Sequence, residues 1–195
     1  MKVINQLKSL KEELSFQNNQ SIGYVPTMGA LHQGHLSLVK LAKKKSQFVI
    51  ASIFVNPTQF NNKNDLKKYP RSLENDLDLL NSESVDLVFC PSYNELYANE
   101  KIVKVDLMGL DKTLEGSNRK GHFEGVIRVL NIFFSLIKPD FAFFGEKDYQ
   151  QYLIVEQFAK TFFPKLKIVS CPTLRESNGL AMSSRNRHLN SREKE

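Results

Sequence analysis

The sequence contains no tryptophan and only two cysteines, and it has no apolar run long enough to cross a membrane. A membrane-spanning helix needs roughly 20 consecutive apolar residues, so a transmembrane protein is not expected. Cys90 and Cys171 each precede a proline, and no signal peptide is evident at the start of the chain. Without a signal peptide, the two cysteines are expected to be reduced thiols of a cytoplasmic protein. A chain of 195 residues can bury a core without disulfide bonds.

The charge is moderately basic, with 27 Lys and Arg against 21 Asp and Glu, a net charge of +6 and a pI near 9.2. A basic surface suits either a nucleic acid or a small anionic substrate. The basic residues are scattered and form no dense stripe with aromatics between them. We therefore expect no nucleic-acid partner; tight, steeply salt-dependent binding to RNA would favour that alternative.

Strand-like and helix-like segments alternate along the chain. Apolar runs predict buried parallel strands, and apolar residues three or four apart predict helices. Strands are expected at 21–25, 48–55, 86–90, 102–105, 141–144 and 166–170, and helices at 3–16, 36–45, 72–81, 123–137 and 149–161. This alternation predicts an α/β fold with a doubly wound, Rossmann-like parallel sheet, formed by one domain over residues 1–190.

Two histidines stand three residues apart where the first long apolar run gives way to a helical pattern, in the segment PTMGALHQGH at 26–35. At that spacing His32 and His35 are expected to share one helical face. The free N–H groups and the dipole of a bare helix start suit a phosphate. Gly29 and Gly34 would let the backbone approach it closely. The pattern predicts a nucleotide-phosphate site rather than a metal site.

Polar motifs also follow the other expected strands. Asn56 and Gln59 come after the second long strand, GEKD at 145–148 follows the strand at 141–144, and a polar loop at 175–187 follows the last strand. Ligands of open parallel sheets bind beyond the carboxyl ends of the strands. These distant segments are therefore expected to converge, with the histidines, on one edge of the sheet.

Taken together, these segments resemble the pantothenate synthetase (pantoate–β-alanine ligase) family. The matching motifs are PTMGALHQGH at 26–35, NPTQF at 56–60, YPR at 69–71, GHFEGV at 121–126, GEKDYQQ at 145–151 and AMSSRN at 181–186. A lone His-x-Gly-His would indicate only the wider nucleotidyltransferase superfamily. The resemblance implies an ATP-dependent, AMP-forming ligase that condenses (R)-pantoate with β-alanine to pantothenate. The intermediate would be pantoyl adenylate, with pyrophosphate and AMP released in turn.

The resemblance also implies the roles of individual residues. His35, His32 and Lys147 would be catalytic, with His35 as a proton donor, while Gln59, Gln151 and Asn56 would bind substrate. The expected ATP-binding residues are Met28, Gly29, Ala30, Leu31, His32, Gln33, Gly34, His35, Gly145, Glu146, Lys147, Asp148, Leu174, Met182, Ser183, Ser184 and Arg185. Loop capping and solvated ion pairs are the ordinary roles of such polar residues.

ATP as a substrate implies Mg²⁺, which usually takes few protein ligands besides the phosphates. Asp76 stands nearest the acidic pair of the family and is the candidate metal ligand, although Asn75 precedes it. Pantoate and β-alanine are the implied small-molecule partners, and the resemblance implies a cytoplasmic homodimer.

The sequence departs from the family pattern in places. Lys120 replaces a usual proline, and Arg128 and Ile132 replace a usual threonine and lysine; Arg128 is expected to restore the charge that Ile132 lacks. Residues 191–195 are expected to begin a C-terminal lid domain that this chain lacks, which would impair turnover. A synthetase for another acid and a non-catalytic nucleotide-binding domain are the remaining alternatives.

Overall fold

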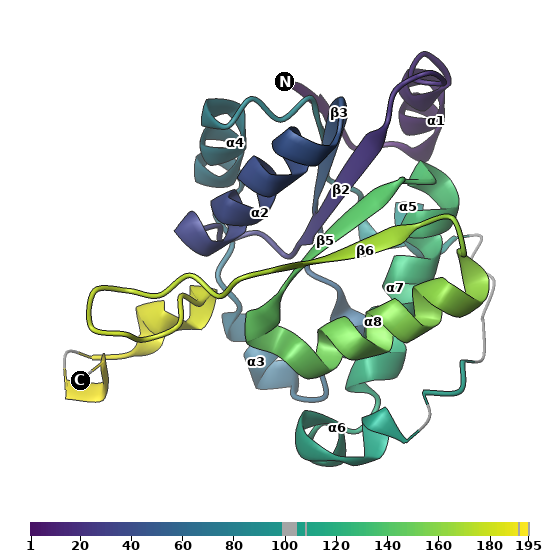
Figure 1. Cartoon of the computed structure of the whole chain (residues 1–195). Helices are drawn as coiled ribbons and strands as arrows, with labels where there is room; N and C mark the ends of the chain where they lie inside the picture. The colour runs from purple at the N-terminus through teal and green to yellow at the C-terminus, as the bar shows by residue number, and fades with distance from the viewer. Residues whose placement is uncertain (99–104, 108, 191, 195) are drawn as a thin grey trace.

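In the part of the chain that the structure describes, six parallel strands form one sheet with helices on both faces (Figure 1). The computed structural model describes all residues except 99–104, 108, 191 and 195, so the expected strand at 102–105 lies largely outside the described residues. The strands are β1 (Lys2–Ile4), β2 (Ile22–Thr27), β3 (Phe48–Ile53), β4 (Leu87–Phe89), β5 (Phe141–Gly145) and β6 (Lys167–Cys171). The α-helices are α1 (Leu7–Ser15), α2 (Gln33–Lys45), α3 (Lys63–Lys68), α4 (Leu73–Ser82), α5 (Tyr93–Tyr97), α6 (Leu114–Asn118), α7 (His122–Ile137) and α8 (Tyr149–Phe162).

The strand order β1-β4-β3-β2-β5-β6 makes the sheet doubly wound. From β2 the chain moves outward through β3 and β4 on one side, and later through β5 and β6 on the other. The winding direction therefore reverses between β2 and β5, and such a switch point leaves a crevice beyond the carboxyl ends of the two strands. The predicted fold class is confirmed, and the topology identifies one position for a ligand.

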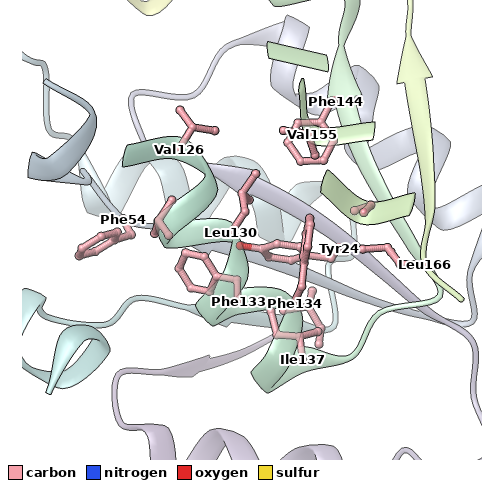
Figure 2. Close-up of a cluster of buried hydrophobic side chains, with 14 of the residues drawn as sticks. Tyr24, Phe54, Val126, Leu130, Phe133, Phe134, Ile137, Phe144, Val155 and Leu166 are labelled. Carbon is pink, nitrogen blue, oxygen red and sulfur yellow. The ribbon is translucent and has the colours of Figure 1, made fainter. Parts of the chain in front are cut away.

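The two faces of the sheet carry separate apolar clusters, because successive strand residues point to opposite sides. On β2, Tyr24 belongs to the larger cluster with α7 and α8, whereas Val25 belongs to the smaller cluster with α2 and α4. Figure 2 shows the larger cluster, in which Phe133 and Phe134 of α7 pack against Tyr24. The Tyr24 hydroxyl is satisfied by Ser52 Oγ at 2.7 Å, which allows the ring to be fully buried.

The expectation of a single helix over 3–16 is wrong at its start. Residues Lys2–Ile4 form β1, which pairs in parallel with β4, and α1 begins only at Leu7. Val3 and Ile4 fit the helical spacing by chance, whereas the sheet edge offers their backbone hydrogen-bond partners. Ile4 is buried there. Local periodicity cannot reveal a three-residue strand whose partner is far away in the sequence.

The other predicted helices and strands among the described residues are present within a few residues of their expected ends. Three short helices, α3, α5 and α6, lie in segments that had no helical pattern. Two of them are capped locally: Asn62 Oδ1 accepts the Asn64 N–H at the start of α3, and Ser92 Oγ accepts the Glu95 N–H in α5. In the part of the chain that the structure describes, no helix is both long and apolar enough to span a membrane.

Candidate active site

A pocket of about 240 Å³ opens at the switch point between β2 and β5. It is lined by the turn after β2, the segment after β3, one side of α7, the segment after β5 and the loop after β6. Of the predicted site residues, those that line it are Met28, His32, Gly34, His35, Asn56, Gln59, Gly145, Lys147, Asp148, Gln151, Leu174, Met182, Ser183, Ser184 and Arg185. The expected convergence of distant segments on one edge is therefore confirmed.

Five of the predicted ATP-binding residues do not line this pocket. Gly29, Ala30 and Leu31 are buried beneath it, while the side chains of Gln33 and Glu146 are exposed. Glu146 instead accepts a hydrogen bond from Ser170 Oγ at 3.1 Å. The backbone N–H groups of the three buried residues are bonded within the protein, to Thr27 Oγ1 or to Asp76.

The two histidines form a capping arrangement at the start of α2. His32 is the N-cap, with an extended backbone (φ −147°, ψ 175°), and its Nδ1 accepts the Gly34 N–H at 3.1 Å. The His32 N–H in turn donates to His35 Nδ1 at 3.3 Å. The expectations of a shared helical face and a bare helix start are therefore wrong, because His32 precedes the helix and caps it. The rings still lie together, with centroids 4.1 Å apart.

Both histidines are neutral, and their hydrogen bonds determine the tautomer. Burial, reinforced by the positive charge of Lys147, lowers the pKa of His32, and burial next to His32 and Lys147 lowers the pKa of His35 to about 3. Because each Nδ1 accepts a backbone N–H, the ring proton belongs on Nε2. Each imidazole can therefore donate one hydrogen bond to an anion in the pocket.

Asn56 is buried and all of its polar atoms are engaged. Its Oδ1 accepts the Thr58 N–H at 3.2 Å and the Tyr97 hydroxyl at 2.8 Å, while its Nδ2 donates to Gly125 O and to Gln59 Oε1, both at 3.0 Å. These partners fix which atom is oxygen and which is nitrogen in the side-chain amides of Asn56 and Gln59. Gln59 Nε2 is therefore the donor side of its amide and donates to Met28 Sδ at 3.3 Å, while Asn56 holds the Gln59 amide in its orientation.

The segment after β5 contributes one positively charged side chain, Lys147, to the pocket. Lys147 Nζ lies 3.1 Å from Asp148 Oδ1, and both side chains are substantially exposed. An exposed pair of this kind is weak, so Lys147 can exchange Asp148 for a more highly charged anion. Gln151 follows on the first turn of α8 and also lines the pocket.

The loop after β6 folds back over the histidine turn. Ser184 Oγ donates to Ala30 O at 2.9 Å, so its hydroxyl is engaged with the protein rather than free for a phosphate. Arg185 makes a two-pronged pair with Asp65 at 2.9 and 3.3 Å and lies over the Tyr69 ring, 5.4 Å from its centroid. Figure 1 shows this yellow segment leaving the sheet beyond β6.

The apolar wall of the pocket was not predicted from the sequence. It consists of Phe54, Val126, Val129, Leu130, Phe133, Phe143 and Phe144. All seven are also buried members of the core, so a sequence pattern cannot distinguish wall from core. Tyr69 also lines the pocket; it belongs to the YPR motif, although no role was assigned to it.

Arg128 does not line the pocket. Its guanidinium lies 4.7 Å from the centroid of the Tyr97 ring, on the side of α7 that faces α5, and Ile132 packs against the core. The arrangement gives no support to the expectation that Arg128 restores a charge beside the phosphates.

Asp76 does not fit the role of a metal ligand. It is buried, it does not line the pocket, and its two oxygens accept the backbone N–H groups of Ala30 and Leu31, each at 2.8 Å. Among the described residues, no group of three or more His, Cys, Asp or Glu side chains could hold a metal ion.

A doubly wound sheet with paired histidines at its switch point defines a nucleotide-binding enzyme with a nucleotidyltransferase-type fold. The family model for pantoate-beta-alanine ligase matches residues 1–195. The chain is 48% identical to the pantothenate synthetase of Buchnera aphidicola from Acyrthosiphon pisum, covering all of this chain and 70% of that protein. This chain belongs to the pantoate–β-alanine ligase family.

Solved structures agree with this assignment. The pantoate-beta-alanine ligase of Francisella tularensis, complexed with beta-gamma ATP and beta-alanine, is 44% identical with a TM-score of 0.93, over 98% of this chain and 74% of that one. The pantothenate synthetase of Thermus thermophilus is 41% identical with a TM-score of 0.91, over all of this chain and 70% of that one.

Proposed function

We propose that this chain activates pantoate with ATP and transfers the pantoyl group to β-alanine. In the first step, a pantoate carboxylate oxygen attacks the α-phosphorus of ATP and the bond to pyrophosphate breaks. In the second step, the β-alanine amine attacks the carbonyl carbon of pantoyl adenylate, AMP leaves, and the amine loses a proton. The products are pantothenate, AMP and pyrophosphate.

The observation that carries this proposal is that one pocket is lined by two chemically different sets of groups, which we assign to two parts of it. Neutral histidine donors and Lys147 form the first set, and Gln59, Gln151 and the apolar wall form the second. An anionic nucleotide suits the first part. A small acid with hydroxyl and methyl groups suits the second.

In the nucleotide part, His32 and His35 would donate Nε2–H hydrogen bonds to phosphate oxygens. Donors that are already oriented stabilise charge as it develops, without reorganising during the reaction. As neutral rings they act by hydrogen bonding rather than as strong acids. Lys147 and Arg185 would supply positive charge, which stabilises the negative charge that develops on the leaving pyrophosphate.

In the acid part, pantoate carries two methyl groups on one carbon, which the apolar wall would cover. Gln59 Nε2 would donate to the pantoate carboxylate or to a hydroxyl, with Gln151 as the second amide. An amide binds such groups without burying another charge. Excluding water from this part also protects a reactive adenylate from hydrolysis.

We propose that Mg²⁺ enters with ATP and is held chiefly by the phosphates, because the described carboxylates provide no ligand cluster. We further propose a cytoplasmic homodimer. The two cysteines fit a reducing compartment, since neither is in a disulfide. Burial raises the pKa of each thiol to about 11, which makes both unreactive.

The test is ATP–pyrophosphate exchange with and without pantoate, with ATP binding measured by calorimetry on the same sample. We expect exchange that depends on pantoate. Exchange that proceeds equally well with an unrelated hydroxy acid would point to another substrate. A sample that neither binds ATP nor exchanges pyrophosphate would contradict the proposal.

A further inference from the structure

The turn between β2 and α2 has an unusual backbone. Gly29 and Ala30 both lie in the left-handed region, with φ of 78° and 51°. Glycine adopts this conformation readily, but at Ala30 it costs about 1 kcal/mol. A strained residue persists when its surroundings fix it in place, and Ala30 is completely buried. The turn leads directly to His32, so its conformation sets where both histidines lie.

Asp76 of α4 fixes this turn from below. Its Oδ2 accepts the Ala30 N–H and its Oδ1 accepts the Leu31 N–H, each at 2.8 Å, while Ser72 Oγ donates to Oδ1 at 3.2 Å. A carboxylate offers two acceptors that match two successive N–H groups, and charged hydrogen bonds are stronger than neutral ones. The fit is close: a Cβ added at Gly29 would lie 2.9 Å from Asp76 Oδ2.

Other groups fix the remaining polar atoms of the turn. Thr27 Oγ1 accepts the Gly29 N–H at 3.2 Å, and Ser184 Oγ donates to Ala30 O at 2.9 Å. The Ala30 peptide groups are thus held by Asp76 on one side and by the loop after β6 on the other. These contacts leave little freedom for the backbone that precedes His32.

We propose that Asp76 is a positioning residue, which holds the turn at 29–31 so that the His32 and His35 rings meet the phosphates correctly. Asp76 does not line the pocket and acts through the backbone of Ala30 and Leu31. The effect of Asp76 on nucleotide binding rests on the proposed function, whereas its effect on the position of the histidine rings does not. This role replaces the metal-ligand role predicted from the sequence.

The test compares Asp76→Asn with Asp78→Asn, an exposed aspartate on the same helix. Asparagine keeps the shape but loses the charge, and its NH₂ group would face a backbone N–H. We expect Asp76→Asn to shift the NMR signals of both histidine rings without nucleotide or metal. We also expect it to weaken ATP binding about tenfold, similar to residues that orient metal ligands. Asp78→Asn should change neither.

Three outcomes would overturn the proposal. One is a folded Asp76→Asn protein whose histidine signals and ATP affinity match the wild type. Another is a loss of affinity that appears only when Mg²⁺ is present, which would restore the metal-ligand role. The third concerns the wild type alone: fast amide hydrogen exchange at Ala30 and Leu31 would mean that the hydrogen bonds to Asp76 do not persist. This last measurement applies even if the variant fails to fold.

Wild-type protein that does not bind ATP would count against the proposed function and leave the histidine test intact.

Discussion

The two sides of the pocket are built in opposite ways. On the side of β2 and β3, the supporting polar groups are buried and bonded to the protein; Asn56, and Asp76 behind the pocket, are each only 1% exposed. On the side of β5 and β6, the cations are at the surface, where the Lys147 and Arg185 side chains are 37% and 46% exposed. The buried side provides fixed geometry, and the exposed side provides charge that can change partners.

This difference follows from the cost of burial. A buried polar group needs its hydrogen-bond partners permanently, so each partner also becomes a constraint on position. An exposed cation is already solvated and loses little when it leaves a surface carboxylate. Substitutions on the buried side should therefore alter both stability and function. Substitutions on the exposed side should alter function alone.

The largest effect is expected for Asn56→Ala. It removes the partners of Gln59 Oε1, Gly125 O and the Thr58 N–H, and should lower the free energy of unfolding by about 3 kcal/mol. Pantoate-dependent exchange should fall by about 100-fold, because the Gln59 amide is no longer oriented. Urea unfolding and the exchange assay measure the two effects.

The exposed neighbour Asn61 gives the matched control, and Asn61→Ala should leave both quantities unchanged. If Asn56→Ala were stable and active, the buried side would not be the rigid part of the pocket.

A second prediction concerns pH and His35. Its pKa is about 3 in the folded protein and about 6.5 when unfolded, so between these values only the unfolded chain binds the proton. Its contribution to stability is therefore complete above about pH 6.5 and is lost as the pH falls toward 3. The slope is at most about 1.4 kcal/mol per pH unit.

Unfolding free energies at about pH 4.5 and about pH 7 would measure this loss for wild type and for His35→Gln. The variant should lose less stability on acidification. A loss equal to that of the wild type would show that His35 is more solvated than its position indicates.

The smallest effect is expected on the exposed side, for Asp65→Asn. Asp65 competes with phosphate for Arg185, so removing its charge should raise ATP affinity by about two- to threefold. The free energy of unfolding should change by less than about 1 kcal/mol. Calorimetry at low and high salt would measure the affinity.

Arg185→Ala, the companion variant, should weaken ATP binding and leave the free energy of unfolding unchanged. Weaker ATP binding in Asp65→Asn would mean that Asp65 orients Arg185 instead of competing for it.

The sequence by itself determined the alternating order of strands and helices, the doubly wound class and the positions of the polar motifs. These depend on local periodicity and on the rule that ligands bind beyond the carboxyl ends of parallel strands. His35, Lys147 and Gln59 could all be placed at one edge in this way, whereas Gln151 was assigned through the family resemblance.

Only the tertiary structure decided what the polar side chains do there. The backbone N–H groups that Asp76 accepts are 45 and 46 residues away in sequence, and Ser184 is 154 residues from Ala30. Such partners leave no local pattern, so Asp76 resembled a metal ligand and Ser184 a phosphate donor until their backbone contacts were known. β1 and the apolar wall were not predicted, for the same physical reason. The pairing of an edge strand and the burial of a side chain are set by the assembled sheet and not by neighbours along the chain.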